Sequence, residues 1–506
     1  MLGRKERDQL EFFVCGSLRD LIPDDHVLVR VDRVLDLSWL AAEVADLYSD
    51  GFGRPGIDPE VAVRLMLAGF LQGIVHDRRL MRDASVNLAI RWFAGFGMSE
   101  ALPDHSTLTR IRQRWGSDRF RLIFTRVVWD CQRAGIVSGD VVHMDATLIR
   151  ADVGLGSLAA RHMEAVDLAN LDEGDRLSRS TGKFKKLCIT DPDATMATSS
   201  AGRQLLPSYK QHTSVDDRAG VIVDIEVVTG EESDFARMSE RLDALEVTLG
   251  RRPGTVTADR AYGIGRVYVA LSRREIEAVI PPRPVTRPGS AKGFPVERFR
   301  YDARHDLVRC PRRKVLTPRS TTKTGRWFRA DADACRACPL RARCIPGAGA
   351  SRRVHISDTH VAVLRARRKR LAWGEEEKRL YSRHRWLVEG AHGLAKTLHG
   401  MNRAARRGLE NMKIQALLTA TAINLKRLAK AILLVLIRAL LRAPQGLPAR
   451  PKRQTKQLFQ QPPGDRFLTR LTTLLGAGVG EGGPRRQVDA AVLRQTLRQA
   501  WQDRCD

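Results

Sequence analysis

Apolar residues recur at helical spacing through the first part of the chain. The pair Asp58-Pro59 is typical of a helix start, and apolar side chains follow it three or four residues apart as far as Leu71. Pro103-Asp104-His105-Ser106 then supplies a turn and an N-cap before a stretch rich in arginine. We therefore predict an all-helical N-terminal region over residues 1–135.

From about residue 139 the pattern changes to short apolar runs bounded by Gly, Asp and Pro, which predict strands at 141–144, 220–228 and 255–257. Helical spacing returns over 234–249 after a cap signal at Ser233, and again over about 374–398 and 409–442. Strands alternating with helices indicate an α/β core. Residues 444–506 are rich in Pro, Gln, Gly and Arg, a composition that predicts a disordered basic tail.

Charge narrows the class of partner. The chain has 86 Lys and Arg against 58 Asp and Glu, a net charge of +28, and such a surplus favours a polyanion as partner. Nucleic acid is the first candidate, although a membrane surface or a ribosome would satisfy the same charge. The N-terminus has no apolar core of signal-peptide length, and the most apolar run, 431–437, is too short to cross a bilayer. We expect no membrane association and a cytoplasmic protein.

Three carboxylates stand out by their settings. Asp145 follows the apolar run 141–144, and Asp259 follows a similar run at 255–258. Glu389 lies on a predicted helix whose helical spacing places Arg385, His392 and Lys396 on the same face. Apolar neighbours that hold the backbone still suit a metal ligand. Each site has a plain alternative, however: a strand-end carboxylate can cap a turn, and a carboxylate among cations can belong to a surface ladder of salt bridges.

Taken together, Asp145, Asp259 and Glu389, on strand, strand and helix, resemble the acidic triad of DDE transposases, whose catalytic domain has a ribonuclease-H-like fold. The segment from Tyr381 to Lys396 resembles the family's Tyr-Arg-Glu-Lys signature, with Arg385 four residues before Glu389 and Lys396 seven after it. The stretches 103–107, 191–194, 208–213 and 411–414 are also similar to segments of this superfamily. The chain departs from the pattern at Tyr381, which is four residues before Arg385 rather than three, and at 260–263, where Arg-Ala-Tyr-Gly replaces Lys-Gly-Tyr.

The resemblance implies roles for these residues. The three carboxylates would hold two Mg²⁺ or Mn²⁺ ions, hard cations that prefer oxygen ligands and activate the attacking and leaving oxygens of a phosphodiester. DNA phosphates would be bound by Arg385, Lys396, Tyr381 and Arg383, and further DNA contacts are expected at Lys210, His212, Arg110 and Arg112. Packing is the alternative for His212, and a solvated helix face for the two N-terminal arginines.

Four of the eight cysteines are close together in the sequence: Cys310, Cys335, Cys338 and Cys344. A Cys-x-x-Cys pair with two further thiols can close a tetrahedral, structural Zn²⁺ site, whereas four free buried thiols are the alternative. A subgroup of the resembling transposases carries a similar cysteine-bearing segment before the glutamate helix. We therefore expect a β-rich, cysteine-bearing insertion at about 280–372 within a catalytic domain spanning 136–443.

The sequence thus predicts a transposase of a bacterial insertion sequence, which binds terminal inverted repeats, cleaves DNA by two-metal hydrolysis and joins the 3′-hydroxyl ends to target DNA. Its partners would be double-stranded DNA and a second copy of the chain, since two element ends must be paired, and its site of action would be the bacterial nucleoid. Two rivals stay open: a ribonuclease-H-like nuclease without strand transfer, and a catalytically dead, zinc-bearing DNA-binding protein.

Overall fold

The computed structural model describes residues 16–49, 56–154, 158–160, 186–188, 190–198, 205–284, 293–345 and 349–442. The predicted tail at 444–506 lies outside the described residues. The chain divides into two compact units, residues 1–136 with 394–506, and residues 137–393. None of the described helices is long and apolar enough to span a membrane.

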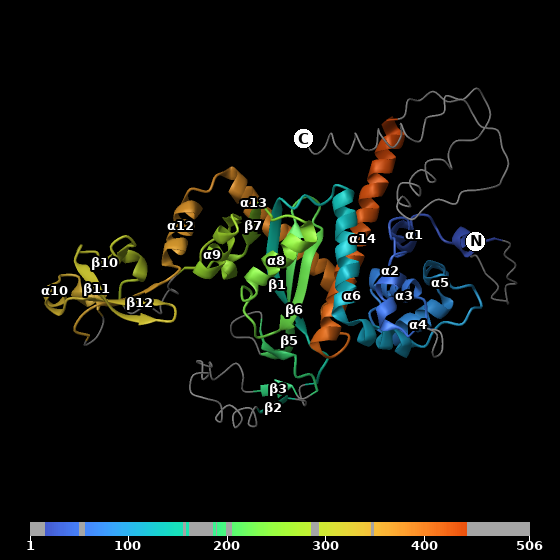
Figure 1. Ribbon diagram of the computed structural model, residues 1–506, viewed down its shortest axis with the longest axis horizontal. Helices are drawn as coiled ribbons and strands as arrows, with labels where there is room; N and C mark the ends of the chain where they lie inside the picture. Colours follow the sequence, from blue (N-terminus) through green and yellow to red (C-terminus); the bar gives the residue numbers. More distant parts are fainter. Residues whose placement is uncertain are drawn as a thin grey trace, which may run out of the picture. The chain divides into compact units, whose positions relative to one another are not determined.

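The first unit is helical in the part that the structure describes (Figure 1). α3 shows how the sequence specifies these helices: the Asp58 carboxylate accepts a hydrogen bond from the Glu60 amide at 2.7 Å, Pro59 occupies the first turn, and the residues that follow bury one another. Its elements are η1 (Leu18–Leu21), α1 (Val27–Asp32), α2 (Leu40–Glu43), η2 (Ala45–Leu47), α3 (Pro59–Leu71), α4 (Asp77–Val86), α5 (Leu88–Ala94), α6 (His105–Arg133) and α14 (Leu409–Arg442). The helical N-terminal region is confirmed.

The long helix α6 packs along α14 in this unit and bends at Gly116, whose φ of 65° and ψ of 179° are not helical (Figure 1). Such a backbone conformation is open to glycine and costly for other residues. Packing groups α14 with the N-terminal helices, whereas the predicted catalytic domain, 136–443, includes it. The boundaries 1–135, 136–443 and 444–506 stay a prediction about the division of function.

The second unit contains a six-stranded main sheet. β1 pairs antiparallel with β5, β5 pairs antiparallel with β6 and with the short β4, and on the other side β1 pairs parallel with β7 and β7 with β8. Its strands are β1 (Val141–Arg150), β4 (Thr195–Ala197), β5 (Leu206–Asp216), β6 (Ile222–Thr229), β7 (Thr255–Ala258) and β8 (Glu277–Val279); β2 (Leu158–Ala160) and β3 (Lys186–Cys188) form a separate pair. The expected α/β architecture is confirmed.

Two local predictions need correction. β1 continues to Arg150 rather than ending at Met144, because its antiparallel pairing with β5 persists as far as Arg150 opposite Ser208. Asp145 therefore lies in the middle of β1, although the parallel partner β7 does end beside it. The helix predicted over 234–249 begins only at Met238, since turns occupy the residues before it.

Helices alternate with strands of the main sheet along the chain, as the α/β pattern predicts (Figure 1). α8 follows β6 and packs against it, and the turn η5 and α9 follow β7. The bounds are α8 (Met238–Leu249), η5 (Arg260–Tyr262), α9 (Gly265–Arg273), α12 (His360–Leu371) and α13 (Glu375–Leu398).

A second, five-stranded antiparallel sheet lies between β8 and α12 in the sequence. It comprises η6 (Val296–Arg298), β9 (Arg300–Asp302), β10 (Leu307–Arg309), β11 (Val315–Thr322), β12 (Gly325–Ala330), α10 (Ala332–Arg336), α11 (Arg341–Cys344) and β13 (Arg353–Ser357). Its own apolar core is built around Phe294, Phe299, Val308, Leu316 and Phe328. Three of the clustered cysteines, Cys310, Cys335 and Cys344, pack against that core.

Candidate active site

The strand register brings the first two candidate carboxylates together. Met144 of β1 is opposite Ala258 of the parallel strand β7, so the next residues of the two strands, Asp145 and Asp259, are neighbours at the point where β7 ends. Side chains alternate between the faces of a sheet, and both carboxylates therefore share a face with His143 and Thr257, two residues earlier. The hydrogen bond of 2.6 Å between His143 Nδ1 and Thr257 Oγ1 confirms that the latter two are on one face.

The gathered acids raise one another's proton affinity. Burial is the largest cause that raises the pKa of Asp145, to about 7. Repulsion from Asp259, Asp234 and Glu389 raises it further, whereas a backbone hydrogen bond with Ala146 lowers it. Burial also raises the pKa of Asp259, and Asp234 adds to that effect. Carboxylates gather at such a cost where a cation or a proton is to be bound.

Helix α13 is fixed on this face of the sheet by buried histidines. Thr257 Oγ1 is hydrogen-bonded at 3.0 Å to His384 Nδ1, and His143 Nε2 is 2.9 Å from Asp217 Oδ1. Burial lowers the pKa of His384 to about 3, so this ring is neutral and bridges the helix to β7 without adding charge. Arg383 completes the attachment by donating to the Asp217 carboxylate at 2.7 Å.

Two turns along α13, His392 joins the helix to Asp145. Its Nε2 is 3.1 Å from Thr213 Oγ1, and its Nδ1 is 3.9 Å from Asp145 Oδ2. Thr213 is the residue of β5 directly opposite Asp145. Glu389, three residues before His392, is exposed and accepts a hydrogen bond of 3.2 Å from Arg385 Nε.

Asp145 lines a narrow pocket with Asp234, His212 and Tyr262. Lys210 Nζ donates to Asp234 at 2.7 Å, so this candidate DNA contact neutralises an acid of the site. His212 is buried, and burial lowers its pKa to about 4. Its Nε2 is buried and has no hydrogen-bond partner among the described residues.

The remaining residues of the predicted phosphate-binding set have different settings. Arg383 is held by Asp217, as described, and Tyr381 is half-buried, with its ring stacked on that of His384 at 6.2 Å between centroids. Arg385 is exposed and free to turn, apart from its ion pair with Glu389. Lys396 lies beyond Gly393, in the first unit, where it is half-buried.

The two N-terminal arginines differ sharply in exposure. Arg110 is exposed on α6, whereas Arg112 is only 2% exposed and forms an ion pair with Asp77, which Arg406 also contacts at 2.7 Å. Arg112 thus has a structural role in this unit, which corrects its assignment to a DNA-facing surface. Arg112 lies on the side of α6 that packs against the other helices, and the sequence alone did not indicate which side of α6 would be packed.

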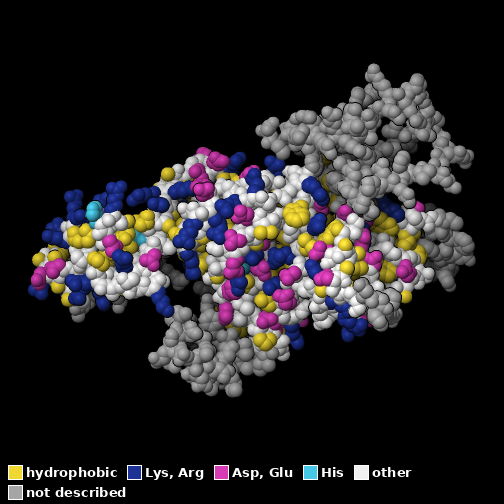
Figure 2. Space-filling model, viewed as in Figure 1, with side chains coloured by type: hydrophobic (Ala, Val, Ile, Leu, Met, Phe, Trp, Pro, Cys, Tyr) yellow, Lys and Arg dark blue, Asp and Glu magenta, His cyan; other side chains and the backbone are white. Residues whose placement is uncertain are grey.

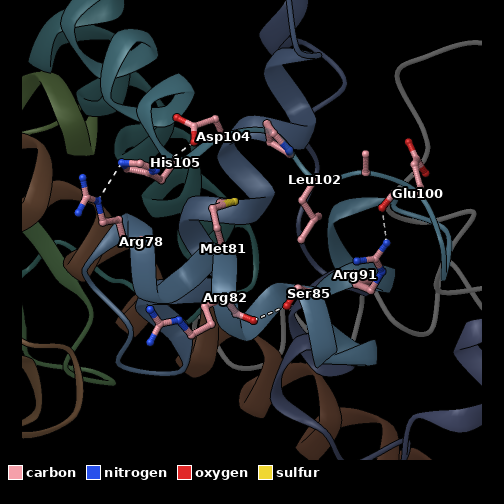
Figure 3. A pocket seen from close by; sticks show the side chains of 11 residues that line it. Arg78, Met81, Arg82, Ser85, Arg91, Glu100, Leu102, Asp104 and His105 are labelled. Atoms are coloured by element: carbon pink, nitrogen blue, oxygen red, sulfur yellow. Dashed lines mark hydrogen bonds and ion pairs between the residues drawn. The ribbon is translucent and has the colours of Figure 1, made fainter.

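A hollow beside the start of α6 is the other cationic feature of this unit. Figure 3 shows Arg78, Arg91 and His105 around it, each directed at a protein partner. Arg78 Nε donates to His105 Nε2 at 3.0 Å, His105 contacts Asp104 at 3.1 Å, and Arg91 Nε donates to the carbonyl oxygen of Gly97 at 2.9 Å. These bonds organise the loop before α6.

The four clustered cysteines are free thiols that line one pocket of the second sheet. They are near enough for Cys335, Cys310 and Cys338 to add to the burial that raises the pKa of Cys344, and Arg352 opposes that rise. Within the described residues, however, no three His, Cys, Asp or Glu side chains are arranged as the ligands of one metal ion. This applies to the cysteines and to the acids alike.

The donor chemistry nevertheless fits the expected ions. The acidic site offers carboxylate oxygens, as Mg²⁺ and Mn²⁺ require, and the repulsion among its acids is relieved by a cation. The cysteine pocket offers four sulfur atoms, the ligand set of structural zinc. In both places the side chains would have to turn toward one another to bind.

Sequence reasoning missed His143, Thr257, His384, Asp234 and Tyr262. For Asp234 it favoured a turn or cap role, whereas its carboxylate lies beside Asp145 and binds Lys210. The signal for His143 and Thr257 was present: each is two residues before a candidate acid on a strand, and so on the same face. Nothing in the sequence indicated which residue of α13 would reach Thr257.

Family comparisons bear on both units. Residues 16–114 match a family model described as a transposase domain, and residues 309–429 match a model described as a transposase DDE domain. Both matches are to transposase domains, and they support a DDE transposase. Glu389 and the four clustered cysteines of this transposase are inside the second match, whereas Asp145 and Asp259 are outside both.

Comparison with curated proteins found no match. Among solved structures, this transposase is similar to a piggyBac transposase in a synaptic complex with hairpin DNA, at 11% identity and a TM-score of 0.30, over 92% of this chain and 87% of that one.

Proposed function

We propose that this transposase cleaves DNA and joins the freed 3′-hydroxyl ends to target DNA, with Asp145, Asp259 and Glu389 as the ligands of two Mg²⁺ or Mn²⁺ ions. The observation that carries the proposal is the gathering of acids where β7 ends beside β1. Burial, and after it repulsion among these acids, raises the pKa of Asp145 to about 7. The order β6-β5-β1-β7-β8, three antiparallel strands followed by two parallel ones, supports a ribonuclease-H-like core.

Each residue then has a task. Two divalent ions, when bound, would activate the attacking oxygen and stabilise the leaving oxygen. Asp145 and Asp259 supply oxygens from rigid strands, and Glu389 supplies one by rotating from Arg385 toward them. Arg385, thus released, is available to a DNA phosphate. His384 and His392 hold α13 on the sheet so that Glu389 stays within reach.

The proposal includes further partners. Pairing two element ends requires two copies of the chain, and we propose a homodimer on double-stranded DNA, acting in the bacterial nucleoid. The second sheet is proposed to be an insertion in the catalytic domain, with Zn²⁺ held by Cys310, Cys335, Cys338 and Cys344. Metal analysis of the purified chain tests this zinc site: absence of zinc from protein purified without chelators would remove it.

The test of the catalytic proposal uses labelled DNA that carries the element ends, taken from the sequence flanking the gene, together with a target plasmid and Mg²⁺. The wild-type chain should cut and join. Asp145→Asn should lower the rate of cleavage by more than ~100-fold, which is the loss expected when only an outer partner of a metal ligand is removed. DNA binding should be kept. Asp140→Asn is the matched control, because Asp140 is exposed just before β1 and pairs with Arg251.

The same experiment separates the rivals. Cleavage without a joined product would leave a nuclease that does not transfer strands. Nicking that is equally strong, or equally absent, in wild type and Asp145→Asn would contradict the assignment of Asp145, and absence in both would favour a catalytically dead DNA-binding protein.

A further inference from the structure

The second sheet has one packed face and one open face. Val308, Leu316, Phe328 and Val354 are buried in its core. Because side chains alternate along each strand, their neighbours in sequence face the other way. The register places a set of mostly cationic and polar residues on this second face, which we call the open face: Arg300, Asp302, Arg309, Val315, Thr317, Trp327, Arg329, Arg353 and His355. Asp302 contacts His305 at 2.8 Å.

Arginines are directly opposite one another on the open face. Arg300 of β9 is opposite Arg309 of β10, and Arg329 of β12 is opposite Arg353 of β13. All four are exposed. Like charges directly across a strand pair destabilise it, so folding alone does not favour this arrangement.

Among the described residues, these arginines also lack carboxylate partners. Within the part of the chain that the structure describes, none of the four has an acidic oxygen within 4 Å, and Arg329 Nε donates only to the neutral Ser351 hydroxyl at 2.8 Å. Arg326, at the end of the same strand β12, is paired with Asp306. Figure 2 shows Lys and Arg side chains gathered over the part of the molecule that Figure 1 labels β11 and β12.

An aromatic pair, Trp327 and His355, lies two residues along β12 and β13 from Arg329 and Arg353. Trp327 is 39% exposed, and its ring is 5.0 Å from that of His355 on the neighbouring strand. An exposed tryptophan ring beside arginines offers a flat surface on which nucleic-acid bases can stack.

We propose that the open face binds the phosphodiester backbone of nucleic acid, through Arg300, Arg309, Arg329 and Arg353. Charge complementarity selects this occupant: an unpaired cationic surface is neutralised by a regular row of phosphates. The proposal deepens the proposed function, since it assigns the transposase a DNA-contacting surface away from its acids. Duplex and single-stranded DNA share the chemistry, and Trp327 provides the means to tell them apart.

The test measures binding by the full-length chain in EDTA, by anisotropy of labelled duplex and single-stranded DNA over a salt series. The triple variant Arg309→Gln, Arg329→Gln, Arg353→Gln should bind about tenfold or more weakly at ~0.15 M salt. Its slope of log affinity against log salt should fall by about 2 to 3 for duplex DNA, about one phosphate contact for each arginine. Trp327→Ala should weaken single-stranded binding if bases stack there.

The matched control removes equal charge from the same region, through Arg304→Gln, Arg312→Gln and Arg336→Gln, which are exposed in turns and on α10 rather than on the open face. Unchanged binding by the first triple, or equal losses in both triples, would overturn the proposal. So would polyglutamate binding that depends on the open-face arginines while DNA binding does not, since the partner would then be an acidic protein. A loss confined to duplex or to single strands supports it and names the form bound.

Unfolding temperatures of the glutamine variants should not fall below that of wild type, which separates lost contact from lost structure. Since no cleavage is measured, the outcome is independent of the proposed active site. Full activity of Asp145→Asn would refute that site without affecting this result, and undiminished binding by the open-face triple would refute this surface without affecting the site.

Discussion

The two sheets of the second unit each bring like charges together, and they do so in opposite ways. On the main sheet, acids are half-buried beside α13, and burial is the largest cause of the raised pKa of Asp145. On the second sheet, arginines are in open solvent, where water and salt screen their repulsion. The buried cluster of acids suits a small cation that fits between them, whereas the exposed cluster of arginines suits a long polyanion. The depth of a charge cluster therefore indicates the size of its partner.

The first unit supplies the contrasting case, in which charges are compensated inside the protein. Arg112 is buried against Asp77, and Arg64 donates to Asp32 at 2.7 Å and to Glu60 at 2.8 Å. Such paired cations need no external ligand. The difference between them and the arginines of the open face is the basis of two predictions about stability, and the acids of the main sheet supply a third.

The largest effect is expected where a compensated charge is removed. Arg112→Ala should lower the free energy of unfolding by about 3 kcal/mol, because it removes a buried side chain and half of the charge that neutralises Asp77. Urea denaturation at neutral pH measures the change. Arg110→Ala, on the exposed side of the same helix, is the control and should cost less than about 0.5 kcal/mol. Equal effects of the two substitutions would contradict the structural role of Arg112.

A smaller effect, of opposite sign, is expected at the acidic site. The pKa of Asp145 is about 7 in the folded chain against 3.8 as the ordinary value, so between these values the folded chain retains a proton that the unfolded chain has lost. Stability therefore falls as pH rises through this window. Asp145→Asn removes the cost of keeping a charged carboxylate in the folded chain. It should therefore stabilise the metal-free chain by about 2 kcal/mol at pH 8, a figure reduced because a quarter of the side chain is exposed to solvent.

Urea denaturation in EDTA at several pH values tests this. The gain should be full above pH 7 and vanish below pH 4, where both states are protonated. Asp140→Asn should show no such gain, since Asp140 is exposed and paired with Arg251. A loss of stability that is the same at every pH would mean that Asp145 serves packing rather than cation binding.

The pattern of apolar and polar residues predicted α3, β7 and α13, but it ended β1 at Met144 rather than Arg150 and began α8 at Asp234 rather than Met238. Order and setting also singled out Asp145, Asp259 and Glu389, and the strands do bring the first two side by side. Burial on a helix was harder to predict. Arg110 and Arg112 differ in the structure because one faces Asp77, and no local pattern encodes a partner 35 residues away.

The histidine contacts of α13 show the same limit. His143 Nδ1 bonds Thr257 across 114 residues, and Thr257 bonds His384 across a further 127, so the set forms only when strand, strand and helix have packed. The open face of the second sheet was equally hidden. Its arginines are scattered in the sequence from 300 to 353, and only the strand register shows which of them are opposite one another.

The smallest effect tests that register directly. Arg353→Gln should raise the free energy of unfolding of the second sheet by about 0.2 to 1 kcal/mol at low salt, because it relieves the repulsion from Arg329 across the strand pair. The gain should disappear at ~1 M salt, where exposed charges are screened within about 3 Å. Arg336→Gln is the control, since Arg336 pairs with Asp333 at 3.1 Å and its removal should bring no gain. A variant that gains stability while losing DNA affinity would show that the open face is maintained for its ligand. A variant that loses stability at low salt would show instead that Arg353 is held by a partner within the fold, and the contrast between compensated and uncompensated arginines would fail at that position.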